Sequence, residues 1–231
     1  MRNLDLDRDQ NMSGLPHSPA LPRRRLTAAR RRRQLIDVAL ESFATKGFNA
    51  TTMEDIATSA GVTKPLLYQH FTSKRALYLE LIDDVAARLI GALAAAATAE
   101  SKTRRQVEAG FEAYFRFTIE NQSAVQMLFD APHDEELARG LRRIEDTIAD
   151  FLAPLFDVGI DGDHRRTLAA AVVGMTEGVT RDWLRIRVEQ HRSAEAASED
   201  AHELARRLSD FAWGGFRSLN KVGAASSAGG R

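Results

Sequence analysis

The segment Thr51–Lys74 holds the side chains of this chain that are best suited to chemical recognition. Its second half carries basic, polar and aromatic residues in close succession: Lys64, Pro65, Leu66, Tyr68, Gln69 and His70. Lysine can donate to guanine acceptors, glutamine can pair with adenine, and proline or leucine can contact a thymine methyl group. This set suits the edges and phosphates of DNA, although each residue could instead be a solvated surface residue.

Two short helices joined by a tight turn would position these residues. Thr51 lies three residues before Glu54, which is the capping-box spacing that opens a helix. Gly61 is expected to end that helix, because glycine accepts the left-handed conformation of a C-terminal cap. Thr63 can cap the second helix, with Pro65 in its first turn.

The second helix has one apolar face, formed by Leu67 and Phe71 at the i, i+4 spacing. A helix this short is unstable alone, so we expect this face to pack on neighbouring helices. The polar, basic and aromatic residues then lie on the outer face, where a ligand can reach them.

An ordered set of short motifs surrounds this segment. A helix from about Thr27 to Lys46 carries Ala39 and Phe43 and ends at a Gly47-Phe48 turn. Thr-Thr before Ile-Ala, Gly-Val, Leu-Tyr-x-His-Phe and Ser-Lys then follow in sequence. Over about residues 26–81 this order resembles the DNA-binding domain of the tetracycline-repressor (TetR) family. One helix-turn-helix pattern alone would be weak evidence, but the ordered set is strong.

The resemblance implies an all-α fold with two functional parts. A three-helix DNA-binding domain is expected at residues 26–75 and a helical effector-binding and dimerisation domain at 76–222. A basic arm at 1–25 and a flexible tail at 223–231 complete the division. The implied function is a sequence-specific transcriptional regulator, a homodimer on a pseudo-palindromic operator. We expect a repressor that a small, largely apolar effector releases, with no cofactor.

The resemblance also assigns roles to individual residues of the segment. It places the Tyr68 hydroxyl at a DNA phosphate and His70 near the DNA backbone, although His70 could instead be an interior histidine. Thr52, Thr63 and Lys74 are expected at phosphates, since a helix N-terminus favours an anion. Leu66 stands where many family members carry a small or polar residue.

The net charge of zero conceals an asymmetry. Up to Arg75 the chain has 13 Lys and Arg against 7 Asp and Glu, a net charge of +6, so the remainder carries −6. A basic N-terminal part on an acidic body is typical of a nucleic-acid-binding module. The arginines at 23–25 and 30–33 could form an arm that reaches phosphates or a minor groove, or a solvated basic tail.

The rest of the chain has the apolar periodicity of successive helices. Ser73 is expected to cap a long helix with the stripe Leu77, Leu81, Val85, Leu89 and Leu93. Further helices are expected at about 103–121, around 125–129, after a cap at Asp134, after a cap at Asp163, and from about Ser198.

Large, soft side chains in these helices could form either a filled core or an apolar pocket for a small molecule. The candidate pocket residues are Phe111, Tyr114, Phe115, Met127, Phe129, Phe151, Met175 and Trp183. Gly174 and Gly178, four residues apart, indicate the close approach of another helix. The resemblance implies dimerisation through the last two long helices, with Trp183, Phe211, Trp213 and Phe216 as candidate anchors or as core residues.

Other function classes have less support. The chain lacks cysteine, a glycine-rich phosphate loop and a Gly-x-Ser-x-Gly motif, which argues against an enzyme acting on a small molecule. Acidic residues around His133 and His164 fit helix starts better than metal sites, so we expect no metal. A constitutive DNA-binding regulator without an effector stays open. No signal peptide or membrane span is visible, and we expect a cytoplasmic protein.

Overall fold

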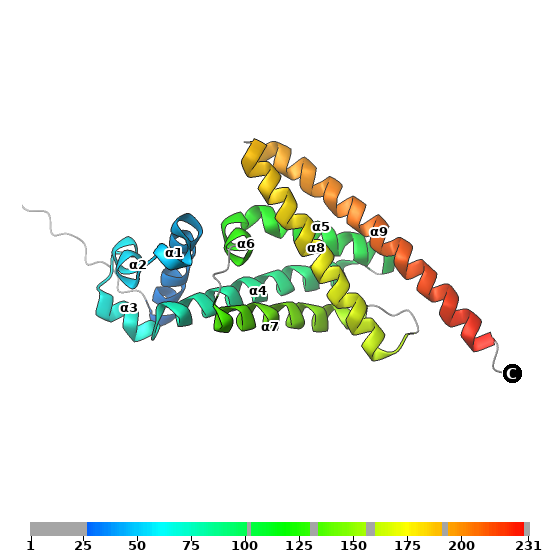
Figure 1. Cartoon of the computed structure of the whole chain (residues 1–231), viewed down its shortest axis with the longest axis horizontal. Coiled ribbons are helices and arrows are strands. Elements are labelled where there is room, and N and C mark those ends of the chain that lie inside the picture. Colours follow the sequence, from blue (N-terminus) through cyan, green and yellow to red (C-terminus); the bar gives the residue numbers. More distant parts are fainter. Residues whose placement is uncertain (1–26, 101–102, 130–133, 156–159, 191–193, 229–231) are drawn as a thin grey trace, which may run out of the picture.

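The computed structural model describes residues 27–100, 103–129, 134–155, 160–190 and 194–228. Within these ranges all regular structure is helical, which confirms the all-α prediction (Figure 1). The helices form a small head of α1–α3 at one end and a larger body of α4–α9.

The head consists of α1 (Ala28–Ala50), α2 (Met53–Ser59) and α3 (Lys64–His70). Leu35, Phe43, Ile56, Leu67 and Phe71 are buried between the three helices. Within α1, Gly47 takes a positive φ of 78°, so the regular helix breaks where the sequence predicts its end. Gly61 also has a positive φ, 63°, at the turn between α2 and α3, as expected for a helix C-terminus.

The predicted cap of α2 is wrong by one residue. The capping box is formed by Thr52 and Asp55, each of which binds the other's backbone N–H. Thr51 is instead fully buried, and its hydroxyl donates to the Gly47 carbonyl at 2.7 Å. Thr51 closes the end of α1, and it is therefore not free to cap the next helix.

The body contains six helices and one 3-10 turn in the described ranges. They are α4 (Lys74–Ala99), α5 (Thr103–Glu120), α6 (Gln122–Phe129), α7 (Glu135–Leu152), η1 (Ala153–Leu155), α8 (Gly162–Gln190) and α9 (Ala194–Ala228). The predicted caps at Ser73 and Asp134 are confirmed, since both side chains accept backbone N–H groups of the first turn.

Three predicted boundaries in the body are wrong. Asp161, not Asp163, accepts a backbone N–H at the start of α8, from His164 at 2.8 Å. Helix α9 begins at Ala194, before Ser198, and continues to Ala228. The segment from Gly223, which was expected to be a flexible tail, is therefore helical as far as Ala228, because its alanines favour helix.

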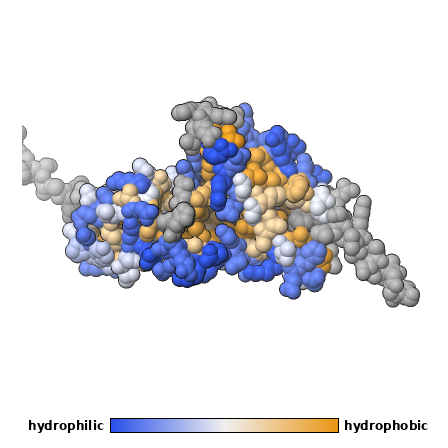
Figure 2. Space-filling model, viewed as in Figure 1, coloured by the Kyte–Doolittle hydropathy of each residue, from blue (hydrophilic) through white to orange (hydrophobic). Residues whose placement is uncertain are grey.

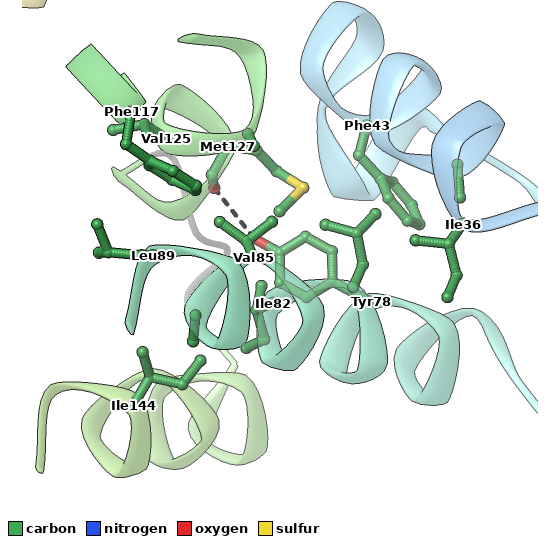
Figure 3. Close-up of a cluster of buried hydrophobic side chains, with 14 of the residues drawn as sticks. Ile36, Phe43, Tyr78, Ile82, Val85, Leu89, Phe117, Val125, Met127 and Ile144 are labelled. Atoms are coloured by element: carbon green, nitrogen blue, oxygen red, sulfur yellow. Dashed lines mark hydrogen bonds between the residues drawn. The ribbon is translucent and has the colours of Figure 1, made fainter. Parts of the chain in front are cut away.

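Helix α4 joins the head to the body. All five residues of its predicted stripe, from Leu77 to Leu93, are buried. Figure 3 shows Tyr78 of α4 between Phe43 of α1 and Met127 of α6. Tyr78 is fully buried, its ring meets that of Phe43 edge-on at 5.3 Å, and its hydroxyl donates to the Met127 carbonyl at 3.1 Å. Head and body thus share one continuous core.

Candidate nucleic-acid interface and effector cavity

The outer face of α3 displays the predicted recognition residues. Leu67 and Phe71 are buried as predicted, while Lys64, Pro65 and Gln69 are exposed and the Tyr68 side chain is 44% exposed. Leu66 and His70 are half-buried at the edges of this face. The structure therefore confirms how α3 divides into an inner and an outer face. It leaves the DNA contacts themselves as predictions.

An ion pair with α2 restrains Lys64. Its ammonium nitrogen lies 3.2 Å from Oε2 of Glu54, and both side chains are exposed. A carboxylate thus stands beside the lysine that we expect at a base edge. The capping-box spacing of Glu54 did not predict this position beside the recognition face.

Thr52 and Thr63 both lie at helix starts and are exposed. The Thr52 hydroxyl is occupied, since it accepts from the Asp55 N–H at 3.1 Å and donates to Asp55 Oδ2 at 2.6 Å. The bonds that the Thr52 hydroxyl and backbone N–H donate to the Asp55 carboxylate, with a smaller contribution from Lys46, lower the pKa of Asp55 to about 2. Thr63 makes no side-chain cap bond, so its hydroxyl is available at the start of α3.

Lys74, predicted at a phosphate, has an internal role. Its ammonium group donates to the carbonyls of Phe48 at 2.7 Å and Thr51 at 2.8 Å, and it lies 4.4 Å from the Phe48 ring centroid. Burial lowers its pKa. Lys74 therefore holds the end of α1 against the start of α4, and its contact with a DNA phosphate stays a prediction.

Two arginines of α1, Arg32 and Arg33, form ion pairs with residues of α4. Arg32 forms an ion pair with Glu80 of α4 and donates to the His70 carbonyl at 2.7 Å. Arg33 pairs with Asp84 of α4 at 2.6 Å. These two arginines brace α1 against α4 rather than extending as an arm. The arginines at 23–25 lie outside the described residues.

An apolar cavity of about 400 Å³ lies in the body. Side chains of α4, α5, α6, α7 and α8 surround it, with Trp213 of α9. Of the eight predicted pocket residues, Phe111, Tyr114, Phe129 and Phe151 line it. Phe115, Met127 and Trp183 are buried in the core instead, and Met175 packs against that core.

Most of the lining was missed by the sequence analysis. The further apolar residues include Val85, Ala86, Leu89 and Leu93 of α4, Val125 and Leu128 of α6, Leu141, Ile144 and Ile148 of α7, and Val172 and Val173 of α8. Polar lining comes from Gln106, Tyr114, Thr118, Glu145, Thr176, Glu177 and Arg181. The periodic stripes had marked many of the apolar positions as buried, but the pattern does not distinguish a core wall from a cavity wall.

Tyr114 gives the cavity wall a neutral polar group. Burial raises its pKa to about 12, so its hydroxyl keeps its proton at physiological pH. This hydroxyl lies 3.1 Å from the Thr180 hydroxyl in a hydrogen bond that links α5 to α8.

The candidate dimer anchors fall into different environments. Phe211 of α9 is 73% exposed, whereas Trp183 is buried and Trp213 is half-buried beside the cavity. Phe216 lies outside the described side chains. Gly174 and Gly178 of α8 are exposed, and open space surrounds the position of a Cβ at each. Figure 2 shows apolar surface across the middle of the body, where α8 crosses it in Figure 1.

The comparisons with known proteins agree with this geometry. Residues 35–81, which span most of α1 through the first part of α4, match the bacterial regulatory proteins of the tetR family. The transcriptional activator FasR of Mycolicibacterium smegmatis is 30% identical over 164 residues, which cover 69% of this chain and 75% of FasR. This chain belongs to the TetR family. It is a sequence-specific DNA-binding transcriptional regulator.

Other regulators match over different lengths of the chain. The transcriptional repressor KstR2 of the same organism is 40% identical over 76 residues, 33% of this chain and 34% of KstR2. A TetR-like regulator from Rhodococcus sp. RHA1 superimposes with a TM-score of 0.60 at 27% identity, covering 79% of this chain and 97% of that one.

A further structural match is the regulator FadR of Bacillus subtilis, solved in complex with stearoyl-CoA. Its TM-score is 0.60 at 17% identity, covering 75% of this chain and 96% of FadR. At that identity the match shows the shared fold. No helix within the described ranges is long and apolar enough to span a membrane.

Proposed function

We propose that this TetR-family regulator is a homodimeric repressor whose operator binding is relieved by a small, largely apolar effector. One observation carries the proposal: the head displays the polar outer face of α3, and the body contains an apolar cavity. It acts on chromosomal operators, and therefore in the bacterial cytoplasm.

The DNA contacts follow from the exposed side chains of α3. Lys64 and Gln69 are assigned to donate to base edges in the major groove, and Pro65 and Leu66 to contact a thymine methyl. Tyr68, His70, Thr63 and Lys74 are assigned to phosphates. Thr52 is assigned to a phosphate as well, which requires its hydroxyl to exchange the bond that it donates to Asp55. Two copies of α3 in a dimer would read half-sites one helical turn apart, about 34–36 Å.

The dimer surface is assigned to α8 and α9. Gly174 and Gly178 are exposed, and among the described residues no atom beyond the adjoining backbone of α8 lies within 4 Å of a Cβ placed at either, so a helix of a second copy can approach closely. Exposed Phe211 on α9 would be buried at the same contact. Large aromatic side chains are costly to leave in water and are frequent interface anchors.

The link from effector to DNA passes through α4 and α6. Both helices line the cavity, and both pack against the head: Tyr78 of α4 contacts Phe43 of α1, and α6 packs against α1. A ligand that changes how these helices pack therefore changes the position of the head. It shifts the equilibrium only if it binds the non-binding geometry more tightly.

A genome-fragment binding selection at near-physiological salt tests the proposal. We expect enrichment of a short pseudo-palindrome and weaker binding by Tyr68→Ala and Lys64→Ala. Arg104 is an exposed residue of α5, and Arg104→Ala should leave operator binding unchanged. Binding that is salt-sensitive, independent of sequence and unaffected by the α3 variants would contradict it.

A cavity-filling variant separates the proposal from a constitutive regulator without effector. Ile148→Trp places a larger side chain in the cavity lining. We expect it to keep operator binding and to lose the thermal stabilisation that a bound ligand gives the wild-type protein. If no small molecule stabilises the wild-type protein in a broad screen, the constitutive alternative holds.

A further inference from the structure

The charged groups of the cavity are confined to one edge. They are Glu145 of α7 and Glu177 and Arg181 of α8, whereas the rest of the lining is apolar or neutral. Glu145 and Arg181 are exposed and Glu177 is half-buried, so this edge faces solvent. An amphiphile in the cavity would lay its apolar body among α4 and α5 and place its head group at the edge between α7 and α8.

Arg181 pairs with one of the two carboxylates at this edge, that of Glu177, and the Glu145 carboxylate has no ion pair among the described residues. Arg181 is paired with Glu177 at 3.8 Å, and its guanidinium carbon lies 5.1 Å from the Phe129 ring centroid. Asp146, the neighbour of Glu145, is paired with Arg166 at 3.3 Å. No residue of the described ranges makes a hydrogen bond or ion pair to the Glu145 carboxylate. The lining thus has two carboxylates for one guanidinium.

The surroundings of Glu145 disfavour its negative charge. Partial burial, followed by the charges of Glu177 and Asp146, raises its pKa. Arg142 and Arg181 attract the carboxylate but do not offset these contributions. A positive group brought to this position would therefore gain from the carboxylates without having to displace an existing partner of Glu145.

From this geometry we propose that the effector is a cationic amphiphile, with an ammonium head held between Glu145 and Glu177 and its apolar body in the cavity. The inference rests on the proposed function, since it concerns the effector of that same cavity. An anionic head would meet two carboxylates and would have to draw Arg181 away from Glu177. A neutral head would leave Glu145 uncompensated.

Three amphiphiles with the same chain test the head group: dodecylamine, dodecanol and dodecanoate, each below its micelle concentration. Trp213 lines the cavity, so tryptophan fluorescence of the full chain reports binding. We expect dodecylamine to bind about tenfold more tightly than dodecanol, since a charge-assisted bond adds on the order of one tenfold step. Dodecanoate is expected to bind more weakly than either.

Variants of Glu145 assign the preference to this carboxylate. Glu145→Gln should weaken dodecylamine about tenfold and leave dodecanol unchanged, by the same charge-assisted contribution. Glu145→Lys should reverse the order in favour of dodecanoate. The matched control is Glu135→Gln, the same change at an exposed residue of α7 that does not line the cavity.

The outcomes separate this inference from the proposed function. Equal affinity for the three head groups, or tightest binding of dodecanoate, would overturn the cationic effector and leave an effector cavity in place. If none of these compounds binds, the inference fails, whereas the effector part of the proposed function fails only if the broad thermal-stability screen also finds no ligand.

Discussion

At the residue scale, the role of each charged side chain near the recognition face depends on the acidic residue with which it pairs. Lys64 and Arg32 are both basic, yet Arg32 pairs with Glu80 within the protein while Lys64 stands on the outer face beside Glu54. Their identities alone do not separate these roles, because the deciding acids come from other helices. The sequence for this reason predicted the exposed side of α3 correctly but did not predict the internal bonds of Lys74.

Glu54 should weaken operator binding, because it competes with DNA for Lys64 and is itself negative. Exposed ion pairs contribute up to about 1 kcal/mol, so Glu54→Gln should tighten operator binding by about two- to fivefold at moderate salt. Fluorescence anisotropy on labelled operator measures this, with exposed Glu120→Gln of α5 as the control. An unchanged or weaker affinity would show that Glu54 does not restrain Lys64.

Asp55 should make the stability of the head depend on acid. Its folded pKa, about 2, lies below the ordinary 3.8, so its carboxylate stabilises the folded state above pH 3.8. That stability is lost as the pH falls from about 4 to about 2. The difference in urea midpoint between wild type and Asp55→Asn should therefore be present at pH 6 and vanish towards pH 2. A difference independent of pH would exclude this origin.

At the element scale, helix order and type were predicted well because capping residues and apolar stripes are local signals. Half of the candidate pocket residues line the cavity, and most of the lining was not among the candidates. Phe111 and Phe115 have the same apolar character and are four residues apart on α5, yet only Phe111 lines the cavity. Which flank of a helix faces a void depends on the angles at which neighbouring helices pack, and the sequence of one helix does not contain that information.

The junction of α1, α4 and α6 should carry both stability and coupling. Tyr78→Phe leaves the buried Met127 carbonyl without this donor, which costs about 1–3 kcal/mol of unfolding free energy. It should also reduce the effect of a bound effector on operator affinity. Urea unfolding and operator titrations measure both. Tyr68→Phe, exposed on α3, is the control for stability; an equal cost in both variants would remove Tyr78 from this role.

At the scale of the whole molecule, the division into a DNA-binding head and a helical body followed from the ordered motifs of residues 26–81. The shared core around Tyr78 did not, since it joins residues 35 or more positions apart in the chain. Dimerisation also belongs to this scale, because the proposed contact at the exposed glycines of α8 involves a second copy of the chain.

A bulky charge on α8 should break the dimer. Gly174→Arg inserts a long cationic side chain where a second copy is expected, whereas Gly91→Arg on α4 adds the same group at another exposed glycine with open space. Sedimentation velocity should give a monomer for Gly174→Arg and a dimer for wild type and Gly91→Arg. A dimeric Gly174→Arg would place the interface elsewhere.

The central claim is that two copies of α3 read the major groove of one operator. Dimethyl sulfate methylates guanine N7, which lies in the major groove, so its protection tests the claim most directly. We predict protected guanines in two half-sites about one helical turn apart, with protection lost in Lys64→Ala. Binding that leaves every guanine N7 reactive would contradict major-groove reading by α3.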